Sequence, residues 1–361
     1  MSFIHFGCWN NGNCNIKDND NGISLLIDYL IKGDYNPDFY VIAGDNYYPE
    51  KKEGNKVFNY TNFLSGFDCI RLLNQKAPIY MLMGNHDLQY ESELYNTKNE
   101  KIDKCSIIEE EILQSKNLNF GRYGRMLNEF TVCLFLNTIF YTDDRDESID
   151  CIKKYKPELN HMDSIEKIIY YEENVLEYLL KLIKDSYDIK NIILIAHDPI
   201  VYRKEKPEKI DEDGRITPQK SVRKPLNLQG IEFINRLFNI IPQSNKYYLC
   251  ADVHQYQKGN IKLGEHKIIQ YVVGTGGAKQ DKLCSPENEE PEIIIKDKLE
   301  FQLLDCQVSF GFLYCQSEGE NIIFDFIPVK QRKKIDIQNF SLINSRIRRP
   351  QRNIFTMKKD L

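Results

Sequence analysis

Four short polar segments of this chain hold residues that bind metal ions or transfer protons: residues 44–48, 84–87, 196–199 and 251–254. Each segment directly follows a short apolar run, and such runs are typical of buried strands. Because open α/β folds place their sites at the carboxyl edge of the sheet, we expect the four segments to converge there. Convergence would gather a carboxylate, a carboxamide and imidazoles, a donor set that suits a pair of hydrolytic metal ions.

The elements that must position these segments follow from the hydrophobic pattern. Residues 3–7 predict a strand, 23–31 a helix and 39–43 the next strand, which together make a right-handed βαβ unit. Further strands are expected at 79–83, 132–137, 192–195, 247–250, 268–273, 311–315 and 322–327, and further helices at 63–74, 165–183 and 231–240. This order predicts an α/β fold with two packed mixed β-sheets flanked by helices.

Two polar stretches contain no motif that indicates a function. Residues 90–120 are charged and predict a surface insertion with one helix near 107–114. Residues 203–228 are rich in Lys, Glu, Asp and Pro and come soon after the third polar segment. They predict either a substrate-facing loop or mobile lid, or a plain surface loop, and the pattern does not separate the two.

The composition is that of a globular protein, with 42% hydrophobic and 28% charged residues among 361. No apolar run approaches the roughly 20 residues that span a bilayer, so no membrane span is expected. Residues 1–8 read as the first strand and not as a signal peptide. The ten cysteines form no CxxC pair, which favours mostly reduced thiols and a cytoplasmic location.

Charge divides the chain into two parts. From Lys330 onward, ten Lys or Arg and two Asp give a net charge of +8, which leaves −13 for the rest because the whole chain carries −5. We therefore expect a catalytic domain at 1–329 and a basic C-terminal tail at 330–361. Such a tail is suited to an acidic partner, to nucleic acid or to the protein's own body, or it is simply solvated and disordered. The oligomeric state cannot be read from the sequence.

Taken together, the polar segments resemble the motifs of a known family. Their order, Gly-Asp-Asn-x-Tyr, Gly-Asn-His-Asp, strand-His-x-Pro and strand-x-x-His, is similar to that of the calcineurin-like metallophosphoesterases. The chain looks most like the purple acid phosphatase branch of the tartrate-resistant acid phosphatase type. Residues 44–48, 273–277 and 310–312 carry this finer likeness, and the similarity extends over about residues 1–328. The resemblance implies a metallophosphoesterase-like four-layer sandwich.

The resemblance also implies a set of metal ligands. Asp45 would bridge two metal ions, and Asn85 and His197 would bind the second of them. His254 would bind the first ion, and Tyr48 resembles the phenolate ligand of ferric iron in that branch. Taken singly, each residue also has a structural explanation: a turn residue at 45, a helix cap at 85, a hydrogen-bonded core histidine at 197 and a packed aromatic ring at 48.

His86 and Asp87 are the expected catalytic residues. His86 follows a metal ligand, so it is expected near the metal ions without binding them. In the family the matching imidazole stabilises the transferring phosphoryl group or protonates the departing alkoxide. Asp87 is expected to orient that imidazole.

Two positions depart from the family pattern. Cys8 stands where the family has an aspartate ligand of the first metal ion, so either a thiolate replaces the carboxylate or the first site is crippled. Asn10 is a candidate for a compensating oxygen. Asp252 replaces a histidine and remains a competent, harder ligand for the second ion. The adjacent Trp9 matches the branch's aromatic residue and supports the alignment.

The resemblance implies a metal-dependent phosphoric ester hydrolase, acid-phosphatase-like, in which a metal-bound hydroxide attacks the phosphoryl group. Its cofactors would be two ions of iron, zinc or manganese, and its substrate a phosphate ester. The departures at Cys8 and Asp252 motivate an alternative, a degenerate phosphoesterase that binds a ligand or partner with weak or no turnover. A purely structural α/β scaffold leaves the four ordered segments unexplained, and a triad hydrolase lacks its Gly-x-Ser-x-Gly elbow.

Overall fold

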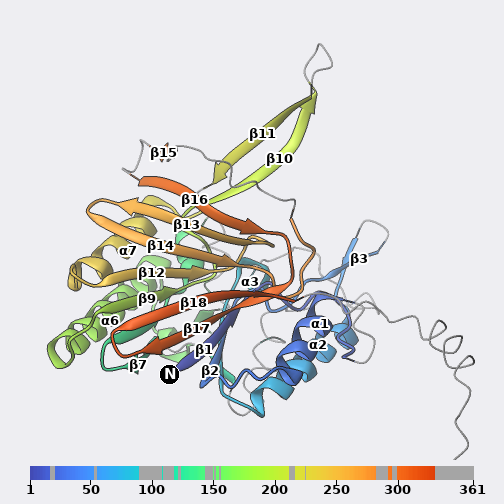
Figure 1. Cartoon of the computed structure of the whole chain (residues 1–361), viewed down its shortest axis with the longest axis horizontal. Helices are drawn as coiled ribbons and strands as arrows, with labels where there is room; N and C mark the ends of the chain where they lie inside the picture. Colours follow the sequence, from blue (N-terminus) through green and yellow to red (C-terminus); the bar gives the residue numbers. More distant parts are fainter. Residues whose placement is uncertain are drawn as a thin grey trace, which may run out of the picture. The chain divides into compact units, whose positions relative to one another are not determined.

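The computed structural model describes residues 1–16, 21–52, 55–88, 108, 118–120, 123–142, 149, 152–153, 156–210, 216–223, 225–281, 292–294 and 299–329 (Figure 1). Contacts divide the chain into one unit at Met1–Lys330 and a second at Gln331–Leu361. The second unit, with the predicted basic tail, lies outside the described residues. So does the helix expected near 107–114, apart from the buried Ile108.

One mixed sheet has six strands in the order β18-β17-β1-β2-β5-β6. Its strands are β1 (Ser2–Phe6), β2 (Phe39–Ala43), β5 (Ile79–Leu82), β6 (Leu118–Phe120), β17 (Gly311–Glu318) and β18 (Asn321–Pro328). β1, β2, β5 and β6 pair in parallel, and β17 and β18 complete the sheet antiparallel. The carboxyl ends of β1, β2 and β5 therefore lie at one edge, as the polar segments require.

The second mixed sheet has eight strands in the order β15-β16-β13-β14-β12-β9-β8-β7. They are β7 (Gly124–Asn128), β8 (Thr131–Phe135), β9 (Asn191–Ile195), β12 (Asn245–Cys250), β13 (Tyr256–Leu263), β14 (His266–Val273), β15 (Glu292–Ile294) and β16 (Leu299–Gln307). β8, β9, β12 and β14 are parallel neighbours. The strands that precede His197 and Asp252 thus lie side by side and end together.

The helices cover the outer faces of the two sheets. α1 (Gly22–Lys32) and α2 (Tyr60–Asn74) pack together beside the first sheet, and α6 (Ile165–Ser186) and α7 (Leu228–Ile240) beside the second (Figure 1). β9 is apolar on both faces: Ile193 and Ile195 belong to the core cluster that includes the first sheet, whereas Ile192 and Leu194 pack in the cluster with α6 and α7. Two packed mixed sheets flanked by helices confirm the predicted fold.

Each of the four long helices in the described part of the chain begins at a side-chain cap. A polar side chain accepts a hydrogen bond from the backbone N–H three residues on, which satisfies a donor that the helix leaves open. The caps are Asn21, Asn59, Ser164 and Asn227. Short elements complete the described fold: α3 (Asn85–Leu88), the 3-10 turns Thr138–Tyr141 and Pro157–Leu159, and the ribbon of β3 (Glu50–Lys52) and β4 (Asn55–Val57).

The stretch expected to be a loop at 203–228 is instead largely a β-ribbon. β10 (Tyr202–Ile210) and β11 (Ile216–Arg223) pair antiparallel and extend away from the sheets (Figure 1). A register shift between Lys206 and Lys209 accommodates Pro207, which cannot donate to a regular ladder. The sequence prediction was wrong here because these two strands pair only with each other, so an alternation of apolar residues toward a larger sheet is not required.

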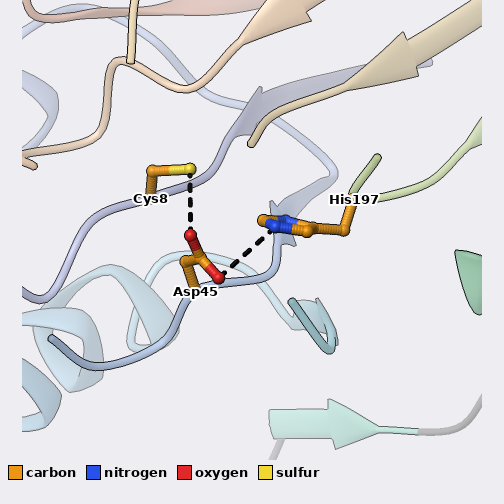
Figure 2. Close-up of side chains that lie close together, drawn as sticks. All are labelled: Cys8, Asp45 and His197. Atoms are coloured by element: carbon orange, nitrogen blue, oxygen red, sulfur yellow. Dashed lines mark hydrogen bonds and ion pairs between the residues drawn. The ribbon is translucent and has the colours of Figure 1, made fainter. Parts of the chain in front are cut away.

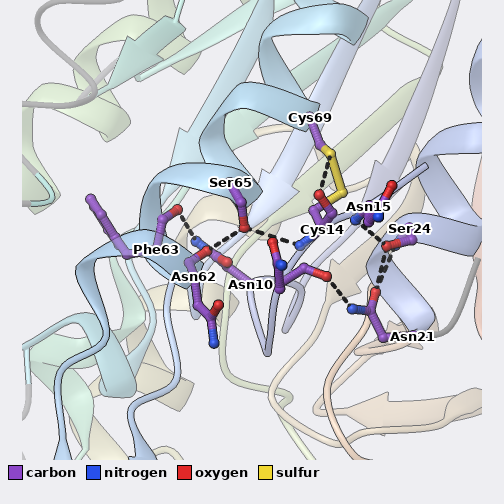
Figure 3. Close-up of a disulfide and its surroundings, with 10 residues drawn as sticks. Asn10, Cys14, Asn15, Asn21, Ser24, Asn62, Phe63, Ser65 and Cys69 are labelled. Atoms are coloured by element: carbon purple, nitrogen blue, oxygen red, sulfur yellow. Dashed lines mark hydrogen bonds between the residues drawn. A yellow bond between two sulfur atoms is a disulfide. The ribbon is translucent and has the colours of Figure 1, made fainter. Parts of the chain in front are cut away.

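The cysteines also differ in part from expectation. Cys14 and Cys69 form a disulfide that joins the loop after β1 to α2 (Figure 3). Among the other cysteines that the structure describes, Cys8, Cys133, Cys250 and Cys315 are buried free thiols, and Cys306 is buried as well. Within the described part of the chain, no helix combines the length and the apolar character needed to cross a membrane.

Candidate metal centre

Three of the predicted ligands sit on the same kind of turn. Cys8, Asp45 and Asp252 each follow the last residues of a parallel strand, and each has a φ of 54°. This left-handed backbone is uncommon for residues other than glycine, although Asp adopts it more readily than most. The repeated turn bends each chain at the carboxyl edge and presents its side chain there.

Backbone hydrogen bonds join the two sheets at this edge. The N–H of Gly7 donates to the carbonyl of Val273 at 3.0 Å, and the N–H of Gly276 donates back to the carbonyl of Gly7 at 3.0 Å. The glycine-rich turn at 274–277 makes this approach possible, since a Cβ on Gly276 would lie 2.6 Å from the Gly7 carbonyl oxygen. The two sets of strand ends are therefore held against each other.

Asp45 lies between Cys8 and His197 (Figure 2). Its Oδ2 accepts a hydrogen bond from the Tyr48 hydroxyl at 2.5 Å and lies 3.6 Å from Sγ of Cys8. The Tyr48 hydroxyl in turn lies 3.0 Å from Nε2 of His254. Cys8, Tyr48 and His254 thus gather on one side of the Asp45 carboxylate.

The other oxygen of Asp45 faces a second group. Its Oδ1 lies 3.3 Å from Nε2 of His197. That same nitrogen lies 3.3 Å from Oδ1 of Asn85 and 3.9 Å from Oδ1 of Asp252. One carboxylate therefore touches two separate donor sets, and the structure brings together all seven residues that the sequence proposed as ligands.

The two imidazoles present the same nitrogen to this centre. Nδ1 of His197 lies 2.7 Å from the carbonyl oxygen of Ala43, and Nδ1 of His254 lies 2.8 Å from that of Lys279. A carbonyl only accepts, so each Nδ1 carries the hydrogen. Each Nε2 is then left for the centre, which is the arrangement that metal-binding histidines use.

Burial and neighbouring charges shift the pKa values of the ionisable side chains in this centre. Burial raises the pKa of the Asp45 carboxyl, but His197 and His86 outweigh it and hold that pKa at about 2. Burial lowers the pKa of His197, yet the Asp45 and Asp198 carboxylates raise it to about 9. Burial raises the pKa of Asp252 to about 7 against the opposing charge of His197. Without a cation, the cluster thus retains protons at neutral pH.

Burial and the Asp45 charge also raise the pKa of the Cys8 thiol well above its ordinary value. The thiol is therefore protonated at neutral pH in the metal-free protein. Thiolate ligation accordingly requires a cation that displaces this proton.

His86 and Asp87 lie at the start of α3. The backbone N–H of His86 donates to Oδ1 of Asp45 at 3.0 Å, and its ring lies 4.7 Å from the Tyr48 ring. The Asp87 carboxylate accepts from the backbone N–H groups of Asn46 and Gly84 at 2.7 and 2.8 Å. Asp87 thereby ties the turn after β5 to the turn after β2, a role that the sequence did not suggest.

Close packing at two glycines shapes the centre. A Cβ on Gly84 would lie 2.3 Å from Oδ1 of Asp45, and a Cβ on Gly44 would lie 2.5 Å from Nδ1 of His197. Both distances are far below van der Waals contact. Any other residue at these positions would displace a predicted ligand.

Asn10 does not supply the compensating oxygen that the sequence suggested. Its side chain points to α2, where Nδ2 donates to the carbonyl of Phe63 at 3.2 Å and the amide packs against Gly66 (Figure 3). The ring of its neighbour Trp9 packs edge-on against Phe67, and its Nε1 donates to Oδ1 of Asn46 at 3.0 Å.

Comparison with known proteins bears on this centre. The family model for calcineurin-like phosphoesterases matches residues 1–256. The chain belongs to the calcineurin-like phosphoesterase family. A search among curated proteins found no match. A solved structure described as "Structure of PhoD" has a TM-score of 0.49 and 13% identity, over 87% of this chain and 63% of that one. The chain thus spans less than two thirds of that protein's length.

Sequence reasoning missed residues of this chain that hold the predicted ligands from outside. Thr138 donates to Oδ2 of Asp198 at 2.7 Å and fixes the turn after His197. Asp281 accepts at 3.1 Å from the backbone N–H of His254. Neither Thr138 nor Asp281 belongs to a readable motif, because each lies far along the chain from the ligand that it supports.

Proposed function

We propose that the protein is a metal-dependent phosphoester hydrolase with two metal ions held on either side of Asp45. The observation that carries this proposal is the position of the Asp45 carboxylate, with Oδ2 toward Tyr48 and Oδ1 toward His197. A carboxylate that faces two donor sets is suited to bridge two cations. Its membership of the calcineurin-like phosphoesterase family supports the same reaction class.

The donor set fits such ions chemically. On the first side, Cys8 supplies sulfur, Tyr48 and Asp45 oxygen, and His254 nitrogen, a mixture that suits zinc or iron better than magnesium. The Tyr48 hydroxyl has a single hydrogen, although both Oδ2 of Asp45 and Nε2 of His254 face its oxygen. A cation among these three groups would accept a lone pair from each of them at once.

The donor atoms on the second side are harder than those on the first. Asn85 and Asp252 offer oxygen, and His197 offers nitrogen. When bound, the two ions supply Lewis acidity, which polarises a phosphoryl oxygen and makes water a nucleophile near neutral pH. The chain's own contribution is to hold the donors rigidly, since Nδ1 of each imidazole donates to a backbone carbonyl.

His86 is the proposed proton donor for the departing oxygen. Its backbone N–H donates to Asp45 and its ring lies tilted against that of Tyr48, so it stays next to the centre without joining either donor set. Asp87 acts through the loop rather than on substrate, because its carboxylate anchors Asn46 and Gly84. The finer assignment to the purple acid phosphatase branch includes Tyr48 as a phenolate ligand and is tested by loading with iron, where tyrosinate ligation gives visible absorption.

The direct test is hydrolysis of p-nitrophenyl phosphate by protein purified with zinc, iron or manganese, together with elemental analysis. Asp45→Ala and Asn85→Ala should each abolish turnover and reduce the bound metal. Asn239→Ala is a matched control, since Asn239 contacts His266 far along the chain from these ligands. Turnover unchanged in both site variants would refute the proposal.

A second candidate, a phosphoesterase-like protein with little turnover, is favoured by one observation. Cys8 is a fully buried thiol whose pKa is raised by burial and by Asp45, so it gives up its proton reluctantly. Cys8→Asp separates the two candidates. If the thiol cripples the first site, metal content and turnover rise together. If Cys8 is a working ligand, turnover falls.

A further inference from the structure

The metal ligand proposed at His254 lies on a short, irregular connection between β12 and β13. It has neither a strand nor a helix of its own to fix it. Its position must therefore come from neighbours elsewhere in the chain. The structure identifies these neighbours as residues 279–281, which follow β14 and the glycine-rich turn.

Three hydrogen bonds connect this segment to His254. The Asp281 carboxylate accepts from the backbone N–H of His254 at 3.1 Å through Oδ2, and the Asp281 N–H donates to the His254 carbonyl at 3.1 Å. The ring Nδ1 of His254 donates to the Lys279 carbonyl at 2.8 Å. Backbone and ring are thus both held, which leaves Nε2 turned toward Tyr48.

The same segment also holds the opposite ligand of the first site. The backbone N–H of Ala278 donates to the carbonyl of Cys8 at 2.9 Å, and a Cβ on Gly274 would come within 3.4 Å of the Cys8 sulfur. Residues 274–281 therefore connect Cys8 with His254, and a change in this segment affects both.

Asp281 is itself fixed by a cation from the β10–β11 ribbon. Nζ of Lys204 lies 2.8 Å from Oδ1 of Asp281, so each carboxylate oxygen has a different partner. Lys204 is near the root of β10, where Gln255 and Gln257 donate to the carbonyl of Arg203 at 3.3 and 2.6 Å. The root of the ribbon is thus anchored to the strand that follows His254.

We propose that Asp281 is a positioning residue for the metal ligand His254, and that Lys204 fixes Asp281 in that role. The inference rests on the proposed function, since it takes His254 as a ligand. The physical reason is that a ligand on an irregular connection binds tightly only when its orientation is set before the metal arrives.

The test compares Asp281→Asn, Asp281→Ala and Lys204→Gln with wild type. Cobalt(II) is the probe, because its absorption reports the geometry of the site and the thiolate contact. Affinity is measured by competition with a chelator, and kcat and KM with p-nitrophenyl phosphate. Loss of a group that orients a metal ligand typically costs about 10–100-fold in affinity. We expect that loss in Asp281→Ala and a smaller one in Asp281→Asn, which keeps an oxygen for the His254 N–H.

Lys204→Gln should fall between Asp281→Asn and wild type. Lys262→Gln and Glu300→Gln serve as controls, since Lys262 and Glu300 form an exposed ion pair of the same 2.8 Å length on β13 and β16. The controls should keep wild-type cobalt affinity and spectrum. Unfolding in chelator reports any general loss of stability separately.

The possible results separate the inference from the function on which it rests. Asp281 variants that keep the cobalt affinity and spectrum of the controls would overturn the positioning role while the hydrolase proposal stands. If wild-type protein binds no cobalt, zinc, iron or manganese, both fail. A wild type that binds metal without turnover refutes the hydrolase alone, and the affinity measurement still decides the role of Asp281.

Discussion

Asp45→Asn is the substitution whose consequences the structure defines most fully. It keeps the shape of the side chain and removes the charge that both donor sets share. In the metal-free protein, Oδ1 of Asp45 lies 3.3 Å from Nε2 of His197, and both side chains are 1% exposed. At an effective dielectric constant of about 20, that separation corresponds to about 5 kcal/mol of attraction. Removing one partner of a buried pair typically costs about 3–5 kcal/mol, which is the expected loss of stability without metal.

The pH of the measurement matters because both groups must be charged. The pKa of Asp45 is lowered to about 2, so its contribution is complete above the ordinary carboxyl pKa of about 3.9 and is lost as the pH falls through 2. The pKa of His197 is raised to about 9, so its contribution is complete below the ordinary imidazole pKa of about 6.5 and is lost as the pH rises through 9. The variant should therefore differ most from wild type between about pH 4 and 6.5.

Urea unfolding with and without zinc measures the effect. A ligand at 100 times its dissociation constant stabilises the folded state by about 2.7 kcal/mol, and wild type should show this increment. Asp45→Asn should lose most of it. Glu172→Gln is the matched control, because Glu172 forms a buried ion pair with Lys156 at 2.5 Å outside the site. This control should lose stability and keep the zinc increment. A full zinc increment in Asp45→Asn would refute the bridging role.

Two further predictions concern the frame around the centre. Gly84→Ala should lower kcat/KM by at least about 100-fold, because its Cβ would lie 2.3 Å from Oδ1 of Asp45, whereas Gly319→Ala, with no neighbour within 4 Å, should keep activity. Replacing Cys14 and Cys69 by Ser should reduce the free energy of unfolding by about 4 kcal/mol under non-reducing conditions, as the chain-entropy model gives for a loop of this size. A reductant should then destabilise wild type but not the double variant, and equal sensitivity of both would contradict the prediction.

Much of the fold could be predicted because its central strands are apolar on both faces. The run Ile192–Ile195 has no polar interruption and only Ala196 separates it from His197, so the sequence defines both the strand and the site at its end. The ribbon of β10 and β11 offers no such signal. Its strands pair only with each other, and their charged composition is equally compatible with a loop.

Some residues of the candidate site could likewise be predicted from the sequence, and others could not. Asp45, Asn85 and His197 could be proposed because each follows a predicted strand in a recognised order. Asp281 could not, since its partners Lys204 and His254 are separated from it by strands whose pairing no local pattern encodes. The pairing of Cys14 with Cys69 is hidden for the same reason, because cysteine spacing alone does not determine connectivity.

The backbone at Cys8 bears on whether the thiol is a working ligand. A φ of 54° is unfavourable for cysteine, because a left-handed backbone at a residue other than glycine costs about 1–3 kcal/mol. The conformation is nevertheless fixed from both sides, since the Cys8 N–H donates to the Gly44 carbonyl and the Cys8 carbonyl accepts from Ala278. Asp45 and Asp252 use the same turn to direct their carboxylates to the centre. The sulfur is thus held where a ligand belongs. Cys8→Asp would relieve backbone strain but place a second carboxylate near Asp45. We therefore expect its effect on the free energy of unfolding to change sign with metal. Without metal the variant should be less stable than wild type, and with a hard ion bound it should be more stable.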